Sequence, residues 1–82
     1  HKLRLVIDYI NDYLERDLSL DELAAIAQLS PYHFSRAFKQ STGISPHRYV
    51  IKQRIERAKQ LLLQGKMSLA DVAIACGFSH QS

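Results

Sequence analysis

The sequence predicts an all-α protein in which two similar helical units are joined by one long linker helix. Apolar residues recur at helical spacing and never alternate for long, four serines stand where helices would begin, and one twelve-residue pattern occurs twice. At 82 residues we expect a single small domain.

The first 30 residues predict two helices. In the first, from about Leu3 to Glu15, one apolar stripe is made of Leu3, Val6, Ile10, Tyr13 and Leu14. The second begins at Ser19-Leu20-Asp21-Glu22, which reads as a capping box. In such a box the serine hydroxyl accepts from the Glu22 amide, while the Glu22 side chain returns to the serine amide.

The next two helices begin at Ser-Pro pairs, because serine caps a helix and proline suits its first position. The third runs from Pro31 and stops before Gly43, and the fourth spans 46–64 and ends at Gly65. Four residues of the fourth helix share a narrow arc and are expected to face a core, namely Ile51, Ile55, Ala58 and Leu62. A fifth helix is predicted to open at Ser68.

The sequence contains an internal repeat, in which residues 19–30 align with residues 68–79 at an offset of 49. Each copy reads as a cap, a short helix with a small residue, a tight turn, an apolar residue and a second serine, which together predict a helix-turn-helix. We expect Leu29 and Phe78 to fill the core after each turn, and Gly77 to adopt positive φ. Gln28 takes the glycine's place in the first copy, so that turn is expected to differ. A plain helical hairpin repeat is the alternative.

The basic residues gather in the middle of the chain. Residues 31–59 hold seven of the eleven lysines and arginines and one of the eight acids, whereas residues 1–30 hold three bases and six acids. This distribution is typical of a protein that presents one face to a polyanion, although a solvated helix would look similar. The 19-residue linker helix would be roughly 28 Å long, which suits a spacer between major grooves about 34 Å apart.

Residues 18–82 resemble the DNA-binding domain of AraC/XylS-type transcription regulators. The likeness rests on Leu23-Ala24, on the run from Ser30 to Lys39, on Gly43-Ile44-Ser45-Pro46, on linker positions such as Arg54 and Ala58, and on Val72-Ala73 and Gly77-Phe78-Ser79. It implies homeodomain-like three-helix subunits, with a first unit at 1–45, a linker at 46–64 and an incomplete second unit at 66–82. In the family the second recognition helix continues past the position of Ser82, so we expect a piece of a longer protein.

The resemblance also implies which residues contact DNA. It places Tyr32, Ser35 and Arg36 at base-reading positions, and Arg36 can bond guanine O6 and N7 together. Gln81 in the second unit could read adenine in the same way, or could simply be a frayed terminal residue.

Basic residues near the junction of the third and fourth helices are better suited to phosphates. Lys39, Arg48 and Lys52 are expected to hold the DNA backbone, which sets register without reading sequence. Arg54 lies nearer the apolar stripe, so we expect it to pair inside the protein with an acid such as Asp21 or Glu22.

Other classes of function find little support. The sequence holds no phosphate loop, paired carboxylates or nucleophile-base arrangement, which argues against an enzyme and against a cofactor. Four scattered histidines predict no metal site, Cys76 is expected to be a small buried residue, and no apolar run is long enough for a membrane. We expect a cytoplasmic, nucleoid-associated protein with DNA and RNA polymerase as partners, and a sensing or dimerisation domain before residue 1. A helical protein-interaction module and a single helix-turn-helix of sigma-factor type are the alternatives.

Overall fold

The computed structural model describes residues 2–78 and contains five helices in that range, with no strand. They are α1 (Lys2–Asp12), α2 (Leu20–Ile26), α3 (Pro31–Thr42), α4 (Pro46–Gln64) and α5 (Leu69–Ala75). The all-α fold is therefore confirmed, and α4 has the bounds that the sequence predicts. None of the described helices combines the length and the apolar character that crossing a membrane requires.

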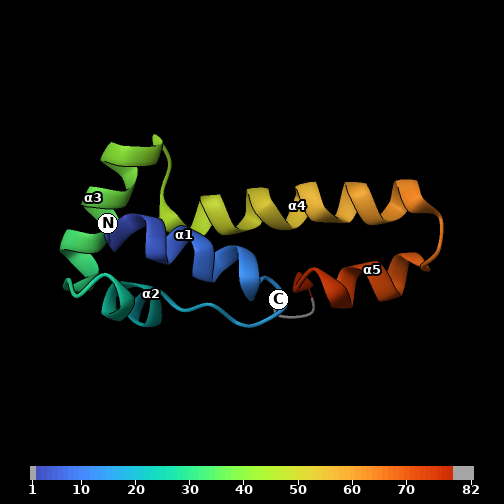
Figure 1. The fold of residues 1–82 in the computed structure, drawn as a ribbon, viewed down its shortest axis with the longest axis horizontal. Helices are drawn as coiled ribbons and strands as arrows, with labels where there is room; N and C mark the ends of the chain where they lie inside the picture. Colours follow the sequence, from blue (N-terminus) through green and yellow to red (C-terminus); the bar gives the residue numbers. More distant parts are fainter. Residues whose placement is uncertain (1, 79–82) are drawn as a thin grey trace.

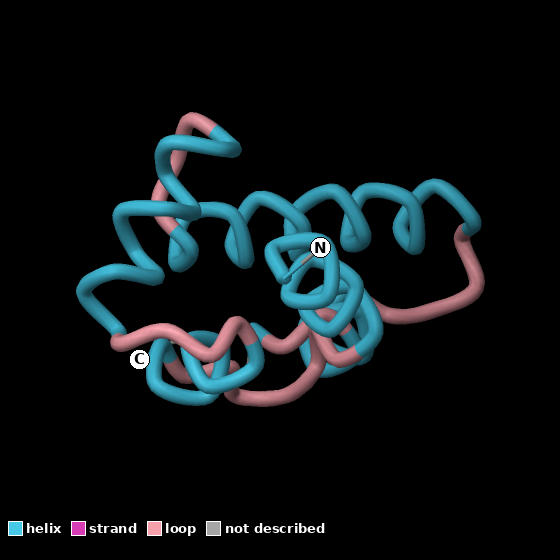
Figure 2. Tube along the Cα trace, turned by 60° about the vertical axis from the view of Figure 1, so that its left-hand side comes forward, coloured by secondary structure: helices cyan, strands magenta, loops and turns pink. Residues whose placement is uncertain are grey.

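The helix α4 runs along the longest dimension of a molecule that measures 40 × 21 × 18 Å (Figure 1). Helices α1, α2 and α3 gather around its first half, while α5 turns back beneath its second half (Figures 1 and 2). The helix α3 thus lies at one end of the molecule and α5 at the other, with α4 as the rod between them.

Serine side chains begin four of the helices. The hydroxyls of Ser19, Ser30, Ser45 and Ser68 accept from the amide three residues later at 3.1, 3.2, 3.3 and 3.1 Å, which satisfies an amide that the helix itself leaves unpaired. The second half of the expected capping box is different. The Glu22 carboxylate accepts from the Tyr9 hydroxyl and pairs with Arg16 at 3.9 Å, so it joins α2 to α1 instead of closing its own cap.

The turn between α2 and α3 has the unusual shape expected at Gln28, whose φ of +59° is the one positive value at a non-glycine residue within 2–78. Gly77 takes the equivalent place after α5 with φ of +88°, as predicted. The prediction that Leu29 fills the core was wrong, because its side chain is 37% exposed. Ala27, which is fully buried, fills the core beside this turn instead.

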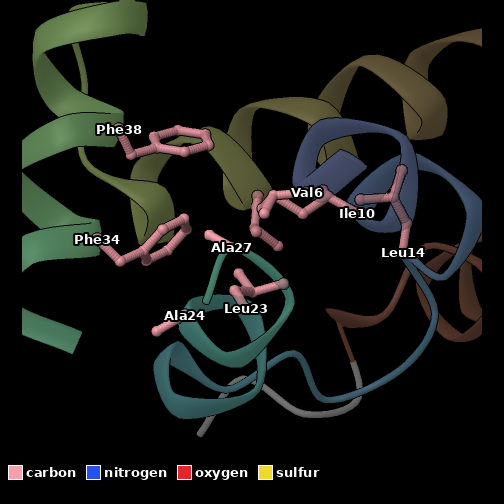
Figure 3. Packing of buried hydrophobic residues seen from close by; sticks show 9 residues of the cluster. Val6, Ile10, Leu14, Leu23, Ala24, Ala27, Phe34 and Phe38 are labelled. Atoms are coloured by element: carbon pink, nitrogen blue, oxygen red, sulfur yellow. The ribbon is translucent and has the colours of Figure 1, made fainter. Parts of the chain in front are cut away.

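The core lies where α1, α2 and α3 meet the start of α4 (Figure 3). The rings of Phe34 and Phe38 project from α3 towards α1 and α2, with their centroids 5.6 Å apart. The other members are small or aliphatic: Val6, Ile10, Leu14, Leu23, Ala24, Ala27 and Val50. Both phenylalanines are fully buried, so one side of α3 is committed to packing and the other is left free.

The helix α1 ends at Asp12, three residues earlier than expected. Val6, Ile10 and Leu14 are buried as predicted, but Tyr13 is 40% exposed and lies outside the stripe. Its ring contacts that of Tyr9 at 4.7 Å between centroids.

The side of α4 that faces the protein differs from the predicted one. Its buried residues are Pro46, Val50 and Arg54, spaced four apart. Of the predicted set, Ile55 and Leu62 are 42% and 45% exposed, while Ile51 and Ala58 are only half-buried. The reason is that the end of α1 lies against the Arg54 side of α4, while the second half of α4 packs against the short α5.

Candidate nucleic-acid interface

The helix α3 presents an exposed polar face opposite its buried phenylalanines. Tyr32, Arg36 and Lys39 lie on this face, and all three are exposed, with Tyr32 at 64%. Because Ser30 caps the helix and Pro31 occupies its first position, the helix begins abruptly and Tyr32 stands in its first turn. The face therefore offers an aromatic ring and two cations at the end of the molecule.

Tyr32 and Arg36 are in direct contact. The Arg36 Nη1 donates a hydrogen bond of 2.9 Å to the Tyr32 hydroxyl, and the guanidinium carbon lies 5.6 Å from the centre of the tyrosine ring. Four residues apart on a helix, the two side chains are neighbours by geometry. The contact narrows the directions in which the remaining Arg36 donors can point.

His33 belongs to the same exposed face of α3, although no binding role was predicted for it. Its Nδ1 lies 2.7 Å from the Ser30 hydroxyl, and its ring meets the Tyr32 ring edge-on at 5.5 Å between centroids. The sequence feature that could have indicated this contact is the spacing of three residues between the capping Ser30 and His33. Ser35, in contrast, is half-buried and lines a cavity of about 450 Å³ between α2, α3 and the start of α4.

The predicted phosphate residues are all exposed cations. Lys39 shares a shallow hollow of about 380 Å³ with Arg36 and Gln40. Arg48 and Lys52 lie on the first turns of α4 and line a groove of about 590 Å³ together with Ile51 and Ile55. The three cations thus lie along α3 and the first turns of α4. Gln81 lies outside the described residues.

Two of the seven basic residues in the middle of the chain serve the interior. Arg54 is 3% exposed, and it donates from Nε to the Leu14 carbonyl at 3.0 Å and from Nη2 to the Arg16 carbonyl at 2.7 Å. An internal role was expected for Arg54, but the expected acidic partner, Asp21 or Glu22, was wrong. Arg57 behaves similarly, since its Nη2 donates to the Asn11 carbonyl at 3.1 Å.

Arg57 binds a carbonyl in the last turn of α1, where the helix leaves carbonyls without partners and carries partial negative charge, and Arg54 binds two carbonyls of the segment just after it. Burial lowers the pKa of the Arg54 guanidinium, and the nearby Asp17 carboxylate opposes that effect. An arginine keeps its charge under such conditions, so a cation is held inside the protein. The basic surface consequently consists of the five other residues, Arg36, Lys39, Arg48, Lys52 and Lys59, all of which are exposed.

The fold and this surface define a class of protein. A short capped helix, a tight turn and a second helix with a polar aromatic and basic face make up a helix-turn-helix, whose second helix enters the major groove in proteins that bind DNA. The sequence pattern of the family described as "Helix-turn-helix domain" matches residues 23–82.

Solved structures identify the branch of that class. The chain is 34% identical to the DNA-binding domain of AdpA, a global transcriptional factor whose crystal structure contains a target DNA, with a TM-score of 0.89 over 94% of this chain and 69% of that one. It is also 34% identical to an AraC-type regulator from Chromobacterium violaceum, with a TM-score of 0.84 over 93% of this chain and 68% of that one. The chain belongs to the family of AraC-type helix-turn-helix DNA-binding domains.

A curated relative is much longer than this chain. The protein named "Probable transcriptional regulator LumQ" from Photobacterium leiognathi is 41% identical over 78 residues, which is 95% of this chain and 32% of that relative. The chain therefore spans about a third of the relative's length.

Proposed function

We propose that α3 is a recognition helix which reads base edges in a major groove through Tyr32 and Arg36, with Ser35 at its inner margin. The observation that supports this most directly is the bonded pair of Tyr32 and Arg36 on the one face of α3 that the core does not use. A guanidinium held in one orientation can offer two donors to guanine O6 and N7. The tyrosine ring would contact the neighbouring base or its sugar.

We also propose that Lys39, Arg48 and Lys52 hold phosphates on either side of that groove. All three are exposed, and none has an ion pair among the salt bridges of residues 2–78, so their charges are free to replace counterions. Such contacts would set the register of α3 on the duplex.

The complete protein would use this domain as its output. In this proposal residues 1–45 form the first unit, 46–64 the linker and 66–82 the start of a second unit that meets the next major groove, with Gln81 among its base-reading residues. The domain would bind DNA without catalysing a reaction. A sensing or dimerisation domain before residue 1, contact with RNA polymerase and residence at the nucleoid would complete a transcription regulator.

The test is a comparison of Arg36→Ala and Lys59→Ala. Lys59 is also an exposed cation, but it lies on α4 beside Glu56 and far along the rod from α3. Arg36→Ala should lose about 1–3 kcal/mol on a duplex selected by the unaltered protein and should relax the preference at one base pair. Lys59→Ala should keep both. An equal loss from Arg36→Ala on selected and random duplexes would make Arg36 a phosphate contact and overturn its base-reading role.

A further inference from the structure

Three segments that are distant in sequence meet at the Arg54 side chain. The guanidinium binds the Leu14 and Arg16 carbonyls just after α1, as described above, and it comes from the middle of α4. The third segment is the turn after α5, where Gly77 approaches both of the others. The first unit, the linker and the second unit thus share one point of contact.

Gly77 makes this approach possible because it lacks a side chain. A Cβ atom at this position would lie 2.2 Å from the Leu14 carbonyl oxygen and 2.8 Å from the Arg54 Nε. Its φ of +88° is also a conformation that residues with side chains rarely adopt. The backbone of the second unit therefore rests directly on the Arg54–Leu14 hydrogen bond.

A buried arginine is an unusual choice for filling space. Removing a charge from water is costly, and replacing a buried ion pair by apolar side chains of similar volume is often neutral or stabilising. What the guanidinium adds is direction, since its planar donors hold two carbonyls in fixed positions. The site is built for orientation more than for stability.

The geometry points to Arg54 as a positioning residue that fixes the second unit relative to the first, and thereby sets the spacing between the two DNA-reading elements. This inference rests on the proposed function, because it assumes that both units address DNA. Without Arg54, α5 would remain attached through α4, but its angle to α1 and α3 would vary.

The first test measures that angle without DNA. Spin labels at Asp12 in α1 and Ala70 in α5, both exposed, report on the two units in a Cys76→Ala background, and labels at Asp12 and Gln40 report within the first unit. Arg54→Lys should broaden the Asp12–Ala70 distance distribution and leave the Asp12–Gln40 distribution unchanged. Arg57→Lys is the matched control, because it loses a bond of the same kind to α1, whereas Arg54 is the arginine nearest the position of a Gly77 Cβ.

Gly77→Ala disturbs the same junction from the side of the second unit and should broaden the same distribution, which keeps the test decisive where Arg54→Lys fails to fold. Unchanged distributions in both variants, equal broadening of both label pairs, or unfolding of both variants would overturn the positioning role.

The second test uses DNA and separates this inference from the proposed function. Duplexes with two half-sites are compared with duplexes whose half-sites are moved apart. The complete protein should prefer the correct spacing, and Arg54→Lys should reduce that preference by about tenfold while binding a single half-site as before. A complete protein that binds equally well at every spacing would refute the two-groove proposal but would not affect the distance result. A spacing preference that survives Arg54→Lys intact would overturn the role of Arg54.

Discussion

Arg36 donates a 2.9 Å hydrogen bond to the hydroxyl of Tyr32, one helical turn earlier on the exposed face of α3. Two of the residues that the family resemblance offers for base reading are therefore a bonded pair in the structure without DNA. Pre-organisation of this kind lowers the conformational entropy lost on binding.

We predict that Tyr32→Phe weakens base discrimination while keeping general DNA affinity. The substitution preserves the ring beneath the guanidinium but removes the hydroxyl that orients it, so binding to a selected duplex should weaken by about 1 kcal/mol. Binding to random duplexes should be unchanged. Tyr13→Phe is the control, since its ring also lies near an arginine, Arg16 at 5.3 Å, but away from α3. Equal affinities of Tyr32→Phe and the unaltered chain for the selected duplex would show that the hydroxyl does not orient Arg36.

A second prediction concerns salt. If Lys52 holds a phosphate, Lys52→Ala should reduce the slope of log affinity against log salt concentration by about 0.9. Titrations at several salt concentrations measure this slope. Lys66→Ala, which removes an exposed charge between α4 and α5, should leave it unaltered. A slope that Lys52→Ala does not change would remove Lys52 from the interface.

Phe34 is predicted to be among the costliest positions to truncate. Its ring is fully buried in the core where α1, α2 and α3 meet, so Phe34→Ala should lower the free energy of unfolding by about 3–5 kcal/mol through lost burial and a residual cavity. Denaturant titration followed by circular dichroism measures the change. Leu63→Ala is the control, because Leu63 is 88% exposed and its truncation should cost no more than about 0.5 kcal/mol. Similar losses from both variants would contradict the position of the core.

The contact of Tyr9 with Glu22 predicts a loss of stability in alkali. The hydrogen bond to the Glu22 carboxylate, with some burial, raises the pKa of Tyr9 in the folded chain above its ordinary value of 10.0. A group whose folded pKa is raised stabilises the fold while it stays protonated. Its contribution is therefore complete below pH 10 and declines as the pH rises towards the folded pKa.

Tyr9→Phe should remove this part of the alkaline decline, as measured by unfolding at a series of pH values above 9. Tyr13→Phe should retain it. If Tyr9→Phe and the unaltered chain lost stability in parallel across that range, the hydrogen bond to Glu22 would not be the cause.

Much of the architecture was encoded locally and could be predicted. Serine caps, Ser-Pro starts and the glycines after α3 and α4 act on the backbone within a few residues, so the bounds of α4 follow from the sequence alone. The buried pair Phe34 and Phe38 followed from helical spacing. Because the same periodicity assigns one face of α3 to the core, it predicts that a DNA-binding site would lie on the opposite face.

Only the tertiary structure decided which way the basic residues point. In the sequence, Arg54 and Arg57 belong to the same basic segment as Arg48 and Lys52. In the structure, Arg54 and Arg57 instead bind carbonyls in and just after the last turn of α1. Periodicity likewise chose the wrong flank of α4, because 3.6 residues per turn says which residues share a face but not which face another helix will cover. Neither local helix propensity nor the charge pattern predicts how α1 packs against α4, because that contact joins residues about 40 apart in the chain. It arises when the core closes, and it divides the basic residues of α4 between the exposed surface and the protein interior.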